Sequence, residues 1–173
     1  MDSTLLRAIL SMDAYNRGYN AGIKFGTLAG DVSIDAPGTQ IGNAVIYDSR
    51  GDTTAQASNF YAVAYNYDSD GDGTGDEIII SYRGTDDPLG TITESFFGGD
   101  IWDGWTAGAG NQDAQQAELA VRFYQDVVDQ VLPSPFTDYT NNGIVLTGHS
   151  LGGGLAGYIG GIGSVAKIGG SQR

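Results

Sequence analysis

The chain has no cysteine among its 173 residues, and it has a single histidine. The absence of thiols excludes disulfide bonds, thiolate nucleophiles and cysteine-ligated metal sites. Basic residues are also scarce, because 8 Lys and Arg stand against 21 Asp and Glu and give a formal net charge of −13. A surface of this charge repels phosphate groups, so we expect no nucleic-acid partner and no tight binding to anionic membranes.

Long apolar runs are missing as well. No stretch approaches the roughly 20 residues of a transmembrane helix, so we expect a soluble protein. The chain begins Met-Asp-Ser-Thr, with an acidic residue where a secretory signal is basic, and no signal peptide is predicted within it. We still expect an extracellular or secreted location, because so acidic a surface suits a salty or calcium-containing medium.

The apolar pattern predicts a single domain over residues 1–173. Helical spacing covers residues 3–16, with Ser3 as the expected cap and a broad apolar face of Leu5, Leu6, Ile9, Leu10, Met12 and Ala14. It returns at residues 114–131, with a buried stripe expected at Ala114, Ala117, Val121, Tyr124, Val128 and Val131. Strands are expected at residues 44–47, 60–67, 77–82 and 144–147. The 77–82 run is apolar enough to be covered on both faces, and the alternation of strands and helices indicates an α/β sheet between helical layers.

Residues 148–152 read Gly-His-Ser-Leu-Gly, which matches the Gly-x-Ser-x-Gly pattern of a nucleophile elbow. The pattern is common by chance in a chain with 28 glycines, but here an apolar strand precedes it and a helix of small residues can follow it. In such an elbow the serine occupies a strained strand-to-helix turn, where flanking side chains would collide with neighbouring elements. The sequence therefore predicts that Ser150 is a nucleophile next to the N–H groups of a helix N-terminus.

Two segments together resemble the class 3 lipases. Residues 147–156 (Thr-Gly-His-Ser-Leu-Gly-Gly-Gly-Leu-Ala) are similar to the nucleophile segment of that family, and residues 80–85 (Ile-Ser-Tyr-Arg-Gly-Thr) are similar to its strand that ends in an aromatic residue, Arg, Gly and then Ser or Thr. The resemblance implies an α/β-hydrolase-like three-layer fold, with Ser150 as nucleophile and the N–H groups of Leu151 and Thr85 as the oxyanion hole. It also implies a lipase or esterase that acts on a lipid or other carboxylic ester and needs no cofactor for catalysis.

The rest of a catalytic triad is missing from the chain. In α/β-hydrolases an Asp or Glu and then a His follow the serine, but residues 151–173 contain none of these three types. The sole histidine is His149, and its ring should not reach the hydroxyl of Ser150 because adjacent side chains of an extended chain diverge. Lys167 is a weak alternative base, since nothing in the sequence indicates the burial that would lower its pKa. We therefore expect this chain alone to be inactive or incomplete.

Three explanations of the missing triad are open. The favoured one is a fragment, or a truncated or frameshifted product, of a lipase-like protein whose fold stops after the nucleophile helix. The others are a site completed by a second chain and a natural pseudo-enzyme. A sheet shortened in this way would expose a strand edge, so we expect self-association or pairing with a complementing chain.

An acidic loop separates the two strongest predicted strands. It holds Asp68, Asp70, Asp72 and Asp76 among turn-making glycines, and this supply of oxygen ligands suits a structural Ca²⁺. The twelfth position from Asp68 is Ile79, where an EF-hand has a Glu, so the EF-hand pattern is incomplete. The alternative is a solvated acidic turn, since Asp and Gly are ordinary turn residues. A non-catalytic, calcium-stabilised pseudo-hydrolase or binding module is accordingly the second functional hypothesis.

Overall fold

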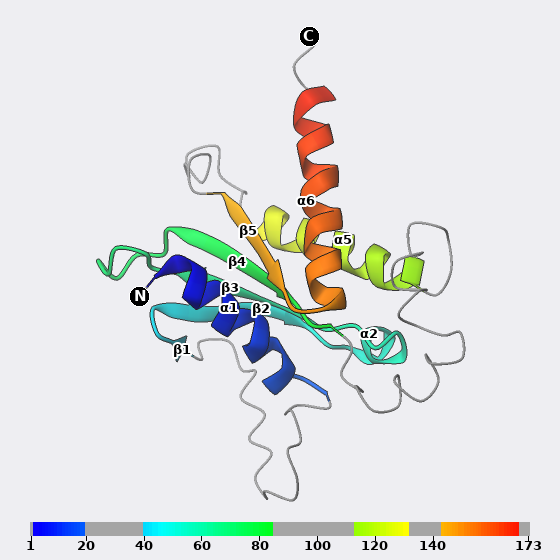
Figure 1. Cartoon of the computed structure of the whole chain (residues 1–173), viewed down its shortest axis with the longest axis horizontal. Helices are drawn as coiled ribbons and strands as arrows, with labels where there is room; N and C mark the ends of the chain where they lie inside the picture. The colour runs from blue at the N-terminus through cyan, green and yellow to red at the C-terminus, as the bar shows by residue number, and fades with distance from the viewer. Residues whose placement is uncertain (1, 20–39, 85–112, 132–142, 170–173) are drawn as a thin grey trace, which may run out of the picture.

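A five-stranded mixed sheet forms the centre of the described structure (Figure 1). The computed structural model describes residues 2–19, 40–84, 113–131 and 143–169, apart from the side chains of 113–114 and 162–169. The strands follow the order β1 (Gln40–Ile41), β2 (Ala44–Arg50), β3 (Ala62–Tyr67), β4 (Glu77–Tyr82) and β5 (Ile144–Gly148). Neighbours are antiparallel except β4 and β5, which run parallel. The predicted α/β class is confirmed.

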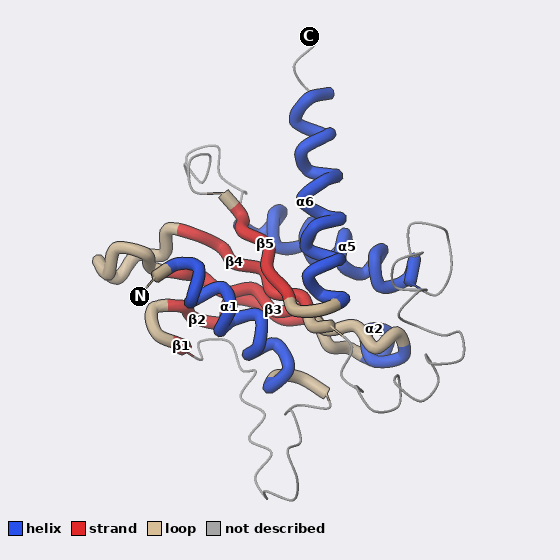
Figure 2. The backbone as a smooth tube through the Cα atoms, in the orientation of Figure 1, coloured by secondary structure: helices blue, strands red, loops and turns tan. Residues whose placement is uncertain are grey.

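Helices cover both faces of this sheet, as Figure 2 shows in blue against the red strands. On one face lie α1 (Ser3–Asp13) and a 3₁₀ turn (Ala14–Asn16). On the other lie α5 (Asp113–Val131) and α6 (Leu151–Gly169), while the short α2 (Thr53–Ala57) connects β2 to β3. The sheet therefore separates two apolar clusters and is the middle one of three layers.

Strands β3 and β4 supply both clusters, because successive side chains of a strand point to opposite faces. Ala64 and Ile80 pack on the face that carries α5 and α6, whereas Tyr65 and Ile79 pack under α1. Five of the six residues of β4 are buried. The prediction that this strand is covered on both faces is confirmed, and β4 is consequently held firmly in place.

The first helix begins as predicted, but its cap is Asp2 and not Ser3. The carboxylate of Asp2 accepts hydrogen bonds from the N–H groups of Thr4 (2.9 Å) and Leu5 (3.1 Å). Ser3 is already the first helical residue, so its hydroxyl is one position too late to cap the helix.

Both predicted helix faces need correction. On the apolar face expected over residues 3–16, three residues are buried, namely Leu6, Leu10 and Ala14. The other three are exposed, namely Leu5, Ile9 and Met12. In α5 the buried stripe is Leu119, Ala120, Phe123, Val127 and Val131. Of the predicted stripe, Val131 is buried as expected, and the side chain of Ala114 lies outside the described residues. The others are only partly buried, namely Ala117, Val121, Tyr124 and Val128. The predicted stripe omitted Leu119 and Phe123, whose burial removes more apolar surface from water.

The predicted strand at 144–147 is present, but it is half-buried along its whole length rather than buried. Within the described residues β5 has one neighbour, β4, and lies at the edge of the sheet. Its Leu146 contacts the α5 and α6 cluster, and its Val145 contacts the α1 cluster. None of the helices in the described part of the chain is both long and apolar enough to cross a bilayer.

Replacing Phe123 by Ala tests the three-layer arrangement. Phe123 is 1% exposed between α5 and the sheet, so Phe123→Ala should lower the free energy of unfolding by about 3–5 kcal/mol. The matched control is Tyr158→Ala on α6, where the side chain is 49% exposed and the expected loss is about 1 kcal/mol or less. Urea denaturation of both variants measures the difference, and equal losses would contradict this packing.

Candidate active site

The turn between β5 and α6 has the geometry of a nucleophile elbow. β5 ends at Gly148 and α6 begins at Leu151, so His149 and Ser150 alone connect them. Ser150 is exposed and has φ of +57°, a left-handed conformation that costs a non-glycine residue about 1–3 kcal/mol. Hydrogen bonds close the turn, from Gly152 N–H to the His149 carbonyl (3.0 Å) and from Gly153 N–H to the Ser150 carbonyl (2.9 Å). The strained strand-to-helix turn predicted for Ser150 is present.

The two flanking glycines are required by close backbone contacts. A Cβ on Gly148 would lie 2.4 Å from the carbonyl of Gly152, and a Cβ on Gly152 would lie 2.0 Å from the carbonyl oxygen of Tyr82. Both distances are far below van der Waals contact. The end of β4, the elbow and the first turn of α6 therefore approach one another closely only because these positions lack side chains.

The first turn of α6 supplies backbone donors next to Ser150. N–H groups at a helix start have no acceptor within the helix, and the aligned peptide dipoles give this end a partial positive charge. Leu151 is the first residue of α6 and follows the serine directly. Its N–H thus belongs to the first turn of the helix, and its role as an oxyanion donor stays a prediction.

The second motif of the resemblance lies against the elbow. A Cβ on Gly84 would meet the carbonyl oxygen of His149 at 2.5 Å and the Cβ of Ser150 at 3.2 Å. The turn after β4 and the turn after β5 are thus in direct contact, although they are distant in the sequence. The parallel pairing of Tyr82 with Gly148 brings the two strand ends together. Thr85, the other predicted oxyanion residue, lies outside the described residues.

Arg83 anchors the end of β4 from within the core. Its side chain is 1% exposed, and its guanidinium lies 4.2 Å and 5.0 Å from the ring centres of Tyr19 and Tyr61. It donates hydrogen bonds to the carbonyls of Tyr19 (2.7 Å) and Arg17 (3.3 Å). These contacts fix the residue before Gly84, so the motif is more than an ordinary strand-end turn.

His149 contacts Tyr15, a residue for which the sequence contains no functional signal. The Tyr15 hydroxyl lies 3.2 Å from Nδ1 of His149, and the two rings meet edge-on. The ring of His149 thus contacts the 3₁₀ turn that follows α1. That His149 is not the base for Ser150 stays a prediction. The side chain of Lys167 is outside the described residues.

The acidic loop between β3 and β4 gathers three of its four predicted ligands. Asp68, Asp70 and Asp76 can each place a carboxylate oxygen within 4.8 Å of the others, whereas Asp72 is not part of this group. Asp68 also accepts hydrogen bonds from N–H groups of the loop backbone, so it stabilises the turn as well. Ile79 is buried in the core and is not available to the loop, which agrees with the incomplete EF-hand pattern.

Asp76 also has a hydrogen-bonding role within this loop. Its carboxylate accepts the hydroxyl (2.7 Å) and the N–H (2.8 Å) of Ser69. These bonds hold the pKa of Asp76 below its ordinary value. A lowered folded-state pKa means that the stabilisation is present above the unfolded pKa and is lost as the pH falls through the folded pKa.

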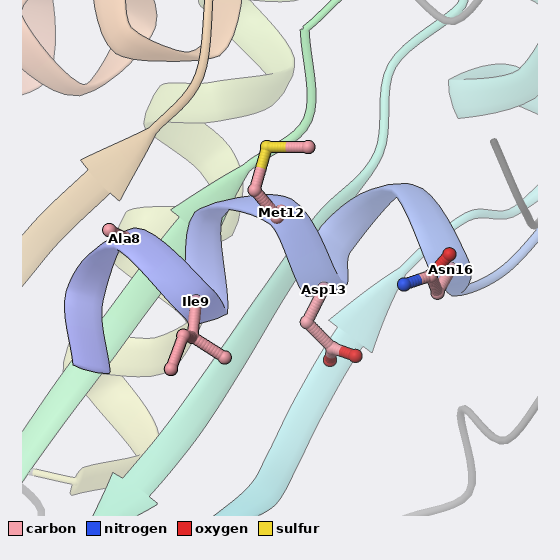
Figure 3. Close-up of a pocket in the computed structure, with 5 residues that line it drawn as sticks. All are labelled: Ala8, Ile9, Met12, Asp13 and Asn16. Atoms are coloured by element: carbon pink, nitrogen blue, oxygen red, sulfur yellow. The ribbon is translucent and has the colours of Figure 1, made fainter. Parts of the chain in front are cut away.

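A separate open cavity of about 400 Å³ lies on α1 (Figure 3). Five residues line it, namely Ala8, Ile9, Met12, Asp13 and Asn16. All five come from α1 and the 3₁₀ turn after it, and neither Ser150 nor Gly84 is among them. The cavity is therefore separate from the elbow.

Substitution of Gly152 tests the close contact between the first turn of α6 and the end of β4. Gly152→Ala should destabilise the fold by about 2–3 kcal/mol, because the new Cβ collides with the Tyr82 carbonyl. Gly154 lies in the same helix with nothing within 4 Å of a Cβ, so Gly154→Ala should stabilise it by about 0.5–1 kcal/mol. We expect the two substitutions to shift the urea midpoint in opposite directions. Stabilisation by both would refute the close contact between the backbones of β4 and α6.

Calcium binding by the acidic loop is tested by a matched pair of variants. We expect saturating Ca²⁺ to raise the melting temperature by about 5 °C relative to a chelator. Asp70→Asn should abolish this rise, whereas Asp72→Asn should keep it, because only Asp70 belongs to the group of three. Each substitution removes one charge and retains an oxygen for the N–H two residues ahead. An unchanged melting temperature in the native protein would argue for a solvated turn.

No family model, no curated protein and no solved structure matched the chain when it was compared with them. The elbow at Ser150, its contact with Gly84 and the acidic loop are therefore the observations from which a function can be argued.

Proposed function

We propose that this chain carries the nucleophile and oxyanion part of a serine hydrolase that acts on carboxylic esters, of the lipase or esterase type and with an α/β-hydrolase-like fold. The observation that carries the proposal is the φ of +57° at the exposed Ser150, between a strand and a helix that both require glycine next to the turn. Strain of this kind persists where the surroundings over-determine it, and it is concentrated at functional sites.

The chemistry follows from the position of the hydroxyl. The Oγ of Ser150 forms a bond to the ester carbonyl carbon, and the carbonyl oxygen becomes an oxyanion. The N–H of Leu151 stabilises this charge, and the resemblance assigns the N–H of Thr85 as a second donor. Each such donor is worth roughly 3 kcal/mol in the transition state. Collapse of the intermediate breaks the bond between the carbonyl carbon and the alkoxy oxygen, which takes up the proton removed from Ser150 and leaves as the alcohol. Water then hydrolyses the acyl-serine.

Activation of Ser150 needs a base that accepts its proton. His149 is the only histidine of the chain, and its Nδ1 lies 3.2 Å from the hydroxyl of Tyr15. We therefore propose that the base and its acidic partner come from outside residues 1–173, either from further polypeptide or from a second chain. The half-buried edge strand β5, which leads into the turn with the serine, is the part of the described sheet where such a partner would add.

A non-catalytic module is the second candidate. The three converging carboxylates of Asp68, Asp70 and Asp76 favour it, because a calcium-stabilised hairpin needs no catalytic base. In that case the elbow would be retained for folding alone, and Ser150 would be unreactive. The two candidates thus differ in the reactivity of one hydroxyl.

A fluorophosphonate probe, followed by intact mass analysis, tests the hydrolase proposal. We expect one adduct, located at Ser150, that forms slowly and forms faster when imidazole is added as an external base. Ser150→Ala should abolish the adduct. Ser58→Ala should retain it, because that hydroxyl donates to the Thr54 carbonyl at a helix end far from the elbow in sequence. If Ser150 stays unlabelled with imidazole present, while a known hydrolase in the same tube reacts, the second candidate is favoured.

A further inference from the structure

We propose that Tyr15 is a positioning residue for Ser150, because its single hydroxyl ties the nucleophile turn to the end of β4. The inference rests on the proposed function, since it concerns how the reacting serine is held. Tyr15 does not touch the reacting atoms in this proposal. It acts through His149 on one side and through Gly84 on the other.

The contacts of the hydroxyl connect three chain segments. The oxygen of Tyr15 accepts the N–H of Gly84 at 3.1 Å, directly after β4. It lies 3.2 Å from Nδ1 of His149 and 3.4 Å from the carbonyl oxygen of the same residue. Tyr15 itself belongs to the 3₁₀ turn after α1, 134 residues before His149. One oxygen therefore connects the 3₁₀ turn after α1, the end of β4 and the elbow.

The contact orients the histidine ring. A phenol has one hydrogen to donate and two lone pairs, and the N–H of Gly84 occupies one of those lone pairs. Nδ1 of His149 meets either the hydroxyl hydrogen or the second lone pair, according to the tautomer of the ring. In both cases Tyr15 holds the orientation of the residue that precedes the nucleophile.

The same hydroxyl lies beside the nucleophile itself. The point that a Cβ of Gly84 would occupy is 2.5 Å from the Tyr15 oxygen and 3.2 Å from the Cβ of Ser150. The phenol oxygen and the serine therefore flank one small space. Tyr15 is 7% exposed, so its hydrogen bonds are shielded from competing water. These bonds are well placed to hold Ser150 in its strained conformation, which an unconstrained turn would leave.

Tyr15→Phe tests this role because it removes only the hydroxyl. We expect the rate of fluorophosphonate labelling at Ser150 to fall about tenfold, the effect of one lost hydrogen bond, with the fold retained. The matched control is Tyr19→Phe, which also loses a tyrosine hydroxyl bonded to a backbone carbonyl, that of Phe60 at 2.7 Å. Tyr19→Phe should label at the native rate. Equal rates for the native protein and Tyr15→Phe would overturn the proposal and leave the proposed function intact.

Two NMR readouts decide the positioning role independently of reactivity. In Tyr15→Phe, but not in Tyr19→Phe, the ¹⁵N resonance of Nδ1 of His149 should shift and the Gly84 amide should exchange faster with solvent. Unchanged resonances and exchange would refute the role, even if no protein labels and the hydrolase proposal fails. Should Tyr15→Phe not fold, exchange in the native protein decides: a protected Gly84 amide supports the bond, and exchange at the rate of an exposed loop overturns it.

Discussion

Three stretches of backbone meet without side chains at Gly84, Gly148 and Gly152, and the described site depends on this approach. The end of β4, the end of β5 and the first turn of α6 lie so close that a single added carbon at any of the three positions would collide with a neighbouring main chain. Parallel pairing of β4 with β5 aligns the two strand ends, and the short connection then forces Ser150 into the left-handed region. Exposure of the serine hydroxyl is a consequence of backbone packing rather than of the serine itself.

The layered core supplies the energy that sustains this strain. β4 is buried on both faces, with Ile80 in one apolar cluster and Ile79 in the other, and so provides a rigid wall for the elbow. Arg83 extends that rigidity past the strand, because its guanidinium lies over the rings of Tyr19 and Tyr61 and donates hydrogen bonds to backbone carbonyls. The cost of one left-handed residue is small beside the burial of such a core. Tyr15 then connects the elbow, which leads into α6, to the layer of α1 on the other face of the sheet.

Sequence reasoning succeeded where the signal was local and periodic. It predicted the strand–turn–helix context of Ser150, the need for glycine on both sides and the doubly covered β4, each from residues within one short segment. It was wrong about part of each helix face, and in α5 the stripe chosen by spacing alone omitted the large apolar residues Leu119 and Phe123. Tyr15 was beyond reach for another reason. Its partners, Gly84 and His149, are 69 and 134 residues away, and no pattern in one sequence reports which tyrosine meets them.

The contact between Gly84 and Ser150 can be measured directly in solution. A ¹³C-edited NOESY spectrum of the native protein should show a strong cross-peak between an α proton of Gly84 and the β protons of Ser150, since the Gly84 Cα–H bond that a Cβ would replace points at the serine. The cross-peak should appear together with backbone shifts of Ser150 that report a positive φ. A spectrum without this cross-peak, and with Ser150 in an ordinary helical or extended conformation, would contradict the account.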